Sequence, residues 1–404
     1  MTQIKSNIPK IRFKEFSWKW GEKRLWEISS KFWYWIWASA IKYDWINKYL
    51  RITDIDDKSR SFIPKPLTSP WLEIENKYIL EKNDIVFART GASVWKSYLY
   101  NVDDWKLIFA WFLIKTNIDK ADSFFVYTQT LRANYDRWVK IMSMRSGQPW
   151  INAEEYKSFK FFLPQLSEQQ KIASFLYLID KKIENVKEKK KSLEEYKKGV
   201  MQKIFSREIR FKDENGDSFG EWEDKKLEEL IEYKNWGSFE NNVVENWEYN
   251  LITLNSIDIN WKIKDFHKKV NITDNSLIKW DLIMVLSDVA HWNFLWLTDI
   301  IPWDNYVLNQ RMWALKPKIN LNRFFLKNLI NYNQKYFKLH WQGSSQQNLS
   351  KWDILKFTFW FPSISEQEKI ADFLIKFDKK IENIWNELDK MEDFKKGLLQ
   401  SMFV

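Results

Sequence analysis

Cysteine is absent from the 404-residue chain, and histidine and glycine are scarce. Without cysteine the chain can form no disulfide and no thiolate metal site. The three histidines, His267, His291 and His340, lie far apart in the sequence and share no spacing typical of metal ligands. We therefore interpret them as ordinary polar residues, and the sequence predicts no metal in this chain.

Long apolar runs are also absent. No segment approaches the ~18 consecutive apolar residues that a transmembrane helix needs. The N-terminal stretch MTQIKSNIPKIRFKEF carries scattered charges and no apolar centre, so it does not read as a signal peptide. The sequence therefore predicts a cytoplasmic protein with no membrane segment. Its length corresponds to two or three domains of ordinary size.

The charge balance is basic. The chain has 64 Lys and Arg against 54 Asp and Glu, which gives a net charge of +10 and a pI near 9.2. This excess favours a polyanionic partner, although many intracellular proteins are basic without binding nucleic acid. Charge alone therefore only suggests nucleic acid as a partner.

Glycine occurs 9 times and tryptophan 26 times, whereas average usage would give about 28 glycines in a chain of this length. Several tryptophans directly follow Asp or Asn, where a glycine would complete a common hairpin turn. These pairs are Asp44-Trp45, Asp104-Trp105, Asn235-Trp236, Asn246-Trp247 and Asn260-Trp261. We hypothesise that the gene uses a genetic code in which UGA encodes glycine, so that many of these positions are glycine in the native protein. The alternative is a genuine tryptophan-rich surface.

The chain contains an internal repeat with a period of about 198 residues. The tetrapeptide IRFK begins at Ile11 and again at Ile209, and SEQQKIASFL at Ser167 recurs as SEQEKIADFL at Ser365. Residues 165–205 and 363–403 share 20 identities in 41 aligned positions. The repeat also sorts the tryptophans: with a local shift of 202, Trp18 aligns with Gly220, whereas Trp20 aligns with Trp222. We interpret Trp20 and Trp222 as genuine and Trp18 as a glycine position.

The second part of each half is predicted to be a long helix. Apolar residues recur every three or four positions from Ile172 to Ile204, with one interval of seven after Val186, and from Ile370 to Met402. This spacing is typical of a coiled-coil seam. Ser167 and Ser365 are the expected N-caps. Two such helices in one chain most simply pair with each other in antiparallel orientation.

The first part of each half, roughly 20–160 and 223–360, mixes short alternating runs such as NDIVFART with helical stretches. This mixture predicts an α+β fold: two mixed α/β domains in a pseudo-twofold repeat, separated by two long helices that form an antiparallel coiled coil. The expected boundaries are 1–164 and 207–362 for the domains and 165–206 and 363–404 for the helices.

The motifs together resemble the DNA-specificity subunit of type I restriction-modification systems. The resemblance rests on RITDID, the loop RTGASVWKSYLY, the segments SGQPWIN and GSSQQNLS, and LPQLSEQQKIASFL followed by KKGVMQKIF. It covers nearly the whole chain. The departures are nearly all tryptophans where the family commonly has glycine, namely Trp26, Trp35, Trp37, Trp45 and Trp95.

The resemblance implies a non-catalytic subunit in which each target-recognition domain reads one half of a split double-stranded DNA site. The helices would set the spacing and dock two methyltransferase subunits, with restriction/translocase subunits in the full complex. S-adenosylmethionine, ATP and Mg²⁺ would belong to those partners. In agreement, the sequence has neither an Asn/Asp-Pro-Pro-aromatic methylation motif nor a nuclease-like metal cluster.

Side chains that suit DNA contact occur in several segments. Gln and Asn can pair with adenine and Arg with guanine in the major groove, and hydroxyl and Lys side chains suit phosphates. The predicted DNA contacts are Arg51, Thr53, Arg89, Thr90, Ser93, Lys96, Ser97, Arg145, Gln148, Asn152, Asn309, Gln310, Arg311, Gln346, Gln347 and Asn348. The alternative for these residues is a plain structural hairpin, a solvated loop or a helix cap.

Two functions of other classes compete with DNA recognition. Gly91 to Ser97 would read GASVGKS if Trp95 were glycine, but a phosphate-binding P-loop needs one more residue between its glycines. The first alternative is therefore a nucleotide-binding enzyme, which the spacing disfavours. The second is a coiled-coil adaptor with two protein-binding modules. The recognised bases do not follow from any motif.

Overall fold

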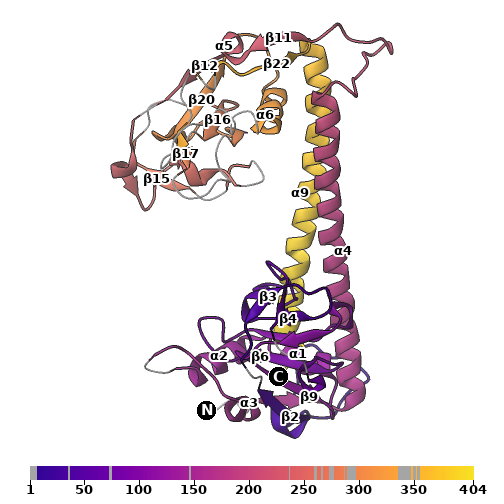
Figure 1. Ribbon diagram of the computed structural model, residues 1–404. Helices are drawn as coiled ribbons and strands as arrows, with labels where there is room; N and C mark the ends of the chain where they lie inside the picture. The colour runs from indigo at the N-terminus through magenta and orange to yellow at the C-terminus, as the bar shows by residue number, and fades with distance from the viewer. Residues whose placement is uncertain are drawn as a thin grey trace. The chain divides into compact units, whose positions relative to one another are not determined.

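The computed structural model comprises two compact units (Figure 1). Unit 1 contains residues 1–187 and 386–404, and unit 2 contains residues 188–385. The structure describes the chain except residues 1–6, 35–36, 72–74, 145–146, 236, 259–261, 265–266, 273–276, 286, 289–296, 335–346, 349–351 and 353–354. The side chains of 287–288 and 347–348 are likewise outside the description. Each unit therefore combines one domain with parts of both long helices.

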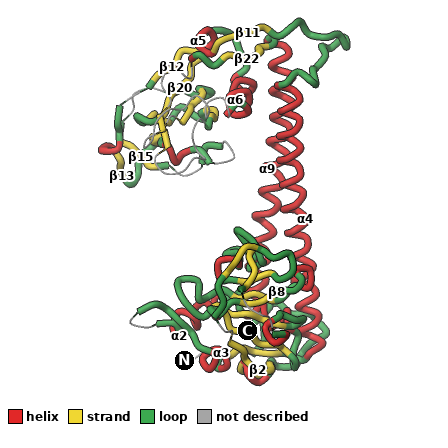
Figure 2. Tube along the Cα trace, viewed as in Figure 1, coloured by secondary structure: helices red, strands yellow, loops and turns green. Residues whose placement is uncertain are grey.

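The two predicted long helices are α4 (Leu166–Phe205) and α9 (Ile364–Ser401), which lie side by side in Figure 2. In unit 1 Lys395 pairs with Asp180 at 2.5 Å, and in unit 2 Lys197 pairs with Asp378 at 2.7 Å. Along α4 from Asp180 to Lys197, the partners on α9 run in the opposite direction, from Lys395 to Asp378. The predicted antiparallel pairing is therefore confirmed. The N-caps predicted at Ser167 and Ser365 are wrong, because both helices begin one residue before these serines.

The domain of unit 1 is built around an antiparallel sheet in the order β2-β9-β6-β7. Its strands are β1 (Gly21–Arg24), β2 (Ser29–Tyr34), β3 (Ala40–Lys42), β4 (Lys48–Leu50), β5 (Thr68–Pro70), β6 (Asp84–Ala88), β7 (Ser97–Leu99), β8 (Leu107–Phe109), β9 (Leu113–Ile118) and β10 (Lys160–Leu163). Its helices are α1 (Ser123–Gln129), α2 (Ala133–Met142), α3 (Ala153–Lys157) and the 3-10 turns η1 (Leu25–Glu27), η2 (Ile52–Asp54), η3 (Asn76–Tyr78) and η4 (Val102–Asp104). Strand β6 is central and buried throughout, as its continuous apolar run requires.

The domain of unit 2 repeats this plan with the sheet order β12-β20-β16-β18. Its strands are β11 (Glu223–Lys226), β12 (Ile231–Lys234), β13 (Val243–Val244), β14 (Tyr249–Ile252), β15 (Lys268–Val270), β16 (Leu282–Val285), β17 (Ser287–Asp288), β18 (Thr298–Ile300), β19 (Tyr306–Leu308), β20 (Met312–Pro317), β21 (Gln347–Asn348) and β22 (Thr358–Phe361). Its helices are α5 (Leu227–Leu230), α6 (Arg323–Tyr332) and the 3-10 turns η5 (Glu240–Asn242) and η6 (Leu254–Ser256). In both domains one strand pair is parallel, β4 with β8 and β14 with β19. The predicted mixed α/β repeat is confirmed.

A buried ion pair joins the two repeated motifs in each unit. Arg12 of the first IRFK donates twice to Glu168 at 2.7 Å, and Arg210 of the second donates to Glu366 at 2.8 and 3.2 Å. Both carboxylates are almost fully buried. The sequence shows both motifs but gives no sign that they touch. The same arginine–glutamate contact is therefore present in both halves of the repeat.

A glutamine beside each carboxylate fastens the helix to its domain. The Gln169 side chain donates to the Pro164 carbonyl and accepts from the Asp122 amide. Asp122 is also the N-cap of α1, through its own side chain. Gln367 does the same with Pro362 and with Asn322, which caps α6. The first turn of each long helix is therefore tied to the first turn of a domain helix.

The segment before each domain docks on the end of a long helix. In unit 2 the Ile209 amide donates to the Lys203 carbonyl, at 3.1 Å. In unit 1 the Ile11 amide donates to the Ser401 carbonyl at 2.9 Å, although these residues are far apart in sequence. Ile209 lies 198 positions after Ile11, and Ser401 lies 198 positions after Lys203, so the two hydrogen bonds join equivalent residues of the repeat. In unit 2 the two residues are close in the sequence, whereas in unit 1 they come from opposite ends of the chain.

The expected division of the tryptophans is only partly met, since Trp95 is half-buried and packs against the core of unit 1. Trp20 and Trp222, interpreted as genuine, are only 2% and 4% exposed, and their rings pack against Phe125 and Phe325. Trp45, by contrast, is 83% exposed. It also has a φ of 67°, a left-handed conformation that favours glycine. The expectation of exposed positions or poor turn geometry is confirmed for Trp45.

Trp280 offers an internal comparison for the glycine hypothesis. The turn before β16 matches the turn before β6, since the amides of Asp281 and Asp84 each donate to a carbonyl three residues earlier. The φ angles at the matching positions are 76° for Trp280 and 73° for Asn83. Asn tolerates this conformation and tryptophan does not. The native residue at 280 is therefore expected to be one that tolerates positive φ.

Replacing Trp280 by glycine is expected to stabilise unit 2 by about 0.5–1 kcal/mol. Relief of left-handed strain, worth ~1–2 kcal/mol, is partly offset by the ~0.5–1 kcal/mol of extra backbone entropy that glycine loses on folding. Urea denaturation would measure the change, with N83G in unit 1 as the matched control. A less stable W280G would contradict the expectation, and tryptophan at positions 35, 37, 45 and 95 in peptides of the native protein would refute the hypothesis itself.

Candidate nucleic-acid interface

Three segments of the unit 1 domain meet where strand β6 ends, next to the start of β9. The Arg89 amide donates to the Phe112 carbonyl, and the Arg89 carbonyl accepts from the Ile151 amide, both at 2.9 Å. Thr90 forms an isolated β-bridge with Trp150. The turn before β9, the end of β6 and the segment before α3 thus lie side by side. We call the surface formed by Tyr34, Arg89, Thr90, Phe112, Gln148 and Trp150 the platform.

The platform brings together predicted residues that are distant in sequence. Arg89 and Thr90 are half-buried, and Gln148 is exposed. Gly91 lies between them at φ 80°, and a Cβ there would come within 3.3 Å of Gln148 Nε2. Its amide donates to the Pro149 carbonyl at 2.8 Å. Glycine therefore permits the close approach of the Gln148 side chain to the backbone at Gly91, two residues from Arg89.

The second domain pairs the corresponding segments. Strand β17 pairs with β21, with Ser287 opposite Asn348 and Asp288 opposite Gln347. The registers of β6 and β16 against the equivalent strands β9 and β20 place Ser287 at the position of Thr90. Thr90 pairs with Trp150 just as Ser287 pairs with Asn348, so both domains present the same backbone frame with different residues on it.

Two predicted contacts in the loop after Gly91 are corrected. Lys96 is buried, and its Nζ donates to the Ile55 carbonyl at 2.6 Å and pairs with Asp57. Ser97 is fully buried and shares a hydrogen bond of 2.6 Å with Thr130. Both side chains hold the domain together and cannot reach DNA from the interior. Ser93 stays half-exposed in the turn and remains a candidate.

Arg51 has a structural partner. Its guanidinium makes two hydrogen bonds to buried Asp54, at 2.7 and 2.8 Å, and a third to the Pro66 carbonyl. The hydrogen bonding to Asp54 raises the pKa of Arg51. The fork that would read guanine is therefore already occupied, which corrects the prediction for Arg51. Thr53 is exposed beside it.

Two predicted amide contacts also have internal roles. The Asn152 side chain caps α3, accepting from the Glu155 amide at 2.8 Å. Asn309 is buried and accepts from the Phe239 amide at 3.1 Å. The alternative of a helix cap is confirmed for Asn152, whose contact with DNA stays a prediction, and the prediction for buried Asn309 is corrected. Gln310 and Arg311 follow in an exposed turn and remain candidates.

Arg145 and Gln346 lie outside the described residues. The backbone of Gln347 and Asn348 forms β21, whereas their side chains are not described. Their contacts with DNA stay predictions.

The nucleotide-binding alternative fails on local structure. A P-loop cradles phosphate at the start of a helix that directly follows the loop. Here the loop after Gly91 turns back with the Val94 amide donating to the Gly91 carbonyl, and it leads into strand β7 at Ser97. The amides that would form a phosphate cradle are thus arranged as a hairpin.

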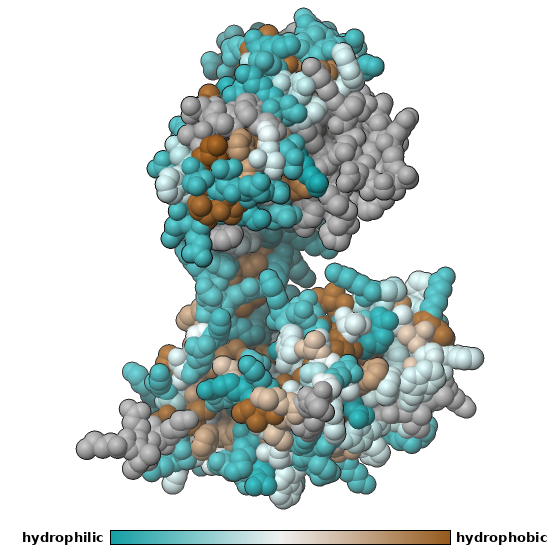
Figure 3. Space-filling view, turned by 90° about the vertical axis from the view of Figure 1, so that its left-hand side faces the viewer, coloured by the Kyte–Doolittle hydropathy of each residue, from teal (hydrophilic) through white to brown (hydrophobic). Residues whose placement is uncertain are grey.

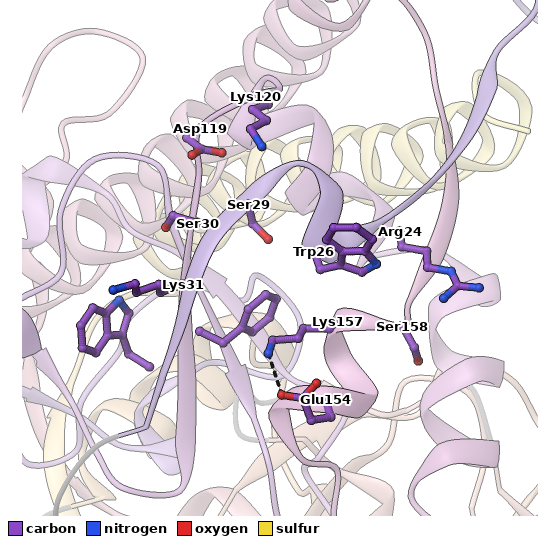
Figure 4. Close-up of a pocket in the computed structure, with 12 residues that line it drawn as sticks. Arg24, Trp26, Ser29, Ser30, Lys31, Asp119, Lys120, Glu154, Lys157 and Ser158 are labelled. Carbon is purple, nitrogen blue, oxygen red and sulfur yellow. Dashed lines mark hydrogen bonds and ion pairs between the residues drawn. The ribbon is translucent and has the colours of Figure 1, made fainter.

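A pocket of about 850 Å³ lies beside β2 in unit 1 (Figure 4). Lys31 comes from β2, Trp26 from η1, and Lys157 and Glu154 from α3, where the two pair at 2.6 Å. Its charged lining residues are Arg24, Lys31, Lys120, Lys157, Asp119 and Glu154. Three separate stretches of the chain, 24–33, 119–120 and 154–158, contribute these residues, so no sequence motif indicates the pocket. It adjoins the platform, because the Tyr34 hydroxyl at the end of β2 accepts from the Ala153 amide at the start of α3.

The surface shown in Figure 3 is mostly hydrophilic, and its apolar residues form small separate groups. Among the described residues no helix is long and apolar enough to cross a membrane. Over the same part of the chain, no group of three or more His, Asp or Glu side chains is placed to hold a metal ion. Polar recognition is the chemistry that this surface offers.

Two repeated α/β domains on an antiparallel helix pair, with one frame carrying different side chains in each domain, define a two-module recognition protein. A model of the type I restriction modification DNA specificity domain matches residues 48–195 and 220–392. The chain therefore belongs to the type I restriction-modification DNA-specificity family, and it is a non-catalytic specificity subunit.

Individual relatives agree with this family. The type I restriction enzyme MjaVIII specificity subunit of Methanocaldococcus jannaschii is 23% identical over 362 residues, covering 84% of this chain and 83% of the relative. The crystal structure of a type I restriction-modification S subunit from M. genitalium matches with a TM-score of 0.57 at 16% identity, covering 98% and 99% of the two chains. A chain from a structural study of complex assembly in a type I R-M system gives a TM-score of 0.56 at 15% identity, covering 95% and 96%. These structural likenesses support the fold.

Proposed function

We propose that each domain of the chain reads one half of a bipartite double-stranded DNA site. The platform is the observation that carries this proposal. The two domains share the backbone pairing of Thr90 with Trp150 and of Ser287 with Asn348, yet the side chains in these segments differ. A constant frame with variable polar side chains suits base readout, in which identity lies in the side chains.

The proposed division of the chain follows the repeat. Residues 1–164 and 207–362 form the recognition domains, and 165–206 and 363–404 form the helices that set the spacing and dock two methyltransferase subunits. Each helix contributes to both units. Exposed apolar side chains such as Leu178 on α4 and Phe394 on α9 support the role in docking.

The catalytic chemistry is assigned to partner subunits in the cytoplasm. Methyltransferase subunits would bring S-adenosylmethionine, and restriction/translocase subunits would bring ATP and Mg²⁺. No cofactor is proposed for this chain. Its contribution is to choose the DNA and to hold the methylating subunits beside it.

The assembled methyltransferase complex is expected to prefer its own site by about 10³-fold or more over DNA in which both half-sites are scrambled. Its affinity should fall steeply as salt rises, because phosphate contacts release counterions. Methylome sequencing of the source organism identifies the site, and fluorescence anisotropy at several salt concentrations measures the preference. A coiled-coil adaptor, the alternative function, would show no preference between the two DNAs.

A further inference from the structure

Arg89 is held in place at both its backbone and its side chain. Its amide and carbonyl bond to Phe112 and Ile151 on either side. Its guanidinium lies over the Tyr34 ring, 5.1 Å from the ring centroid. Tyr34 is itself fixed, because its hydroxyl accepts from the Ala153 amide at 2.6 Å. Stacking of this kind orients a guanidinium plane without using its N–H groups.

The guanidinium of Arg89 has unused donors. Two other arginines of unit 1 have acceptors within the chain, since Arg12 bonds to Glu168 and Arg51 bonds to Asp54. For Arg89, no oxygen among the described residues accepts a hydrogen bond from the side chain, and its Nε is buried without a partner. A fixed donor group without an acceptor is preorganised for a ligand that supplies one.

We propose that Arg89 reads a guanine in the major groove of the half-site bound by the first domain. This assignment rests on the proposed function of DNA recognition. Guanine presents O6 and N7 side by side, which matches the two parallel N–H groups of a guanidinium. Tyr34 is the positioning residue, since its ring lies against the guanidinium.

The second domain carries a different residue at the position of Arg89. The segment DIVFART that contains Arg89 aligns with DLIMVLS from Asp281 to Ser287 through the registers of β6 and β16. The residue at the position of Arg89 is then Leu286, which lies outside the described residues. Leucine has no hydrogen-bond donor in its side chain. The proposed guanine contact is therefore not repeated at this position of the second domain.

The test uses the complex of this chain with its methylating subunits and a panel of DNAs. Each DNA carries one base-pair change within the half-site that the first domain reads, and affinity is measured at fixed salt. R89A is expected to lose about 10- to 100-fold in affinity for the native site. It should lose nothing for the DNA in which one particular G·C pair is already replaced. R89K should lose the same discrimination, because an ammonium lacks the planar fork.

R137A is the matched control, because Arg137 is an exposed arginine of the same domain that bonds to Asn134 on α2. It should leave the base profile unchanged. A uniform loss across the panel in R89A and R89K, or full discrimination by either variant, would overturn the assignment to guanine. So would a first half-site with no G·C pair. A wild-type complex that binds every DNA equally would overturn the proposed function as well, so the two failures are distinguishable.

Discussion

Replacing Glu366 by alanine is expected to destabilise unit 2 by about 3 kcal/mol. The carboxylate is fully buried and accepts from Arg210, at 2.8 and 3.2 Å, and from Trp222 Nε1, at 2.9 Å. Removing one partner of a buried ion pair typically costs ~3–5 kcal/mol. The Arg210 side chain is 23% exposed and can regain some water, which places the expected loss at the lower end.

Hydrogen exchange of the α6 amides would measure this loss locally, since a protein of two units need not unfold in one step. E368A is the matched control, because Glu368 lies on the same helix and is exposed; it should change stability by less than about 0.5 kcal/mol. In unit 1, E168A should lower protection of α1 in the same way. Equal protection in E366A and E368A would show that the ion pair does not hold the domain on the helix.

Exchanging residues 20–160 for the matching domain of a relative is expected to replace one half of the methylated motif completely and to leave the other half unchanged. The exchange points lie side by side, because β1 pairs with β10 from Gly21 opposite Leu163 to Arg24 opposite Lys160. The chain enters and leaves the domain through this two-stranded neck. The incoming domain must also supply the contacts that seat it on the helices, such as the packing of Trp20 and Phe125 against Leu176.

Methylome sequencing of cells that carry the exchanged subunit would read out the new motif. Unit 2 offers the reciprocal experiment, since β11 and β22 form the same neck from Glu223 opposite Phe361 to Lys226 opposite Thr358. Exchange of 223–360 should alter only the other half of the motif. A change in both halves from a single exchange would contradict independent reading by the two domains.

The sequence predicts what depends on local pattern. The helices follow from apolar spacing, and the exposure of Trp45 follows from the preceding Asp44, since a turn residue lies at the surface. The contact of Arg12 with Glu168 spans 156 residues and has no local signal, so it needed the structure. The duplicated motifs mark those residues as candidates for a shared role, but they do not say that they meet.

The candidate site shows the same limit. Side-chain chemistry predicts DNA contact for Arg89 and Gln148, and the fold brings their segments together. The same chemistry predicts contact for Lys96, yet its amine bonds inward to the Ile55 carbonyl. Direction alternates along a strand, so a strand beginning one residue earlier or later reverses which side chains face solvent. Chemistry alone could not separate Lys96 from Arg89.

The joint made by Ile11 with Ser401 and by Ile209 with Lys203 makes chain connectivity partly redundant. In unit 1 the joint holds without a peptide link, through the same hydrogen bond that unit 2 makes close along the chain. A cut between Ser206 and Glu208 would therefore remove a covalent bond while leaving intact the buried Arg210–Glu366 pair that seats the second domain. The duplicated contacts, rather than the order of the segments along the chain, hold each domain on the helices.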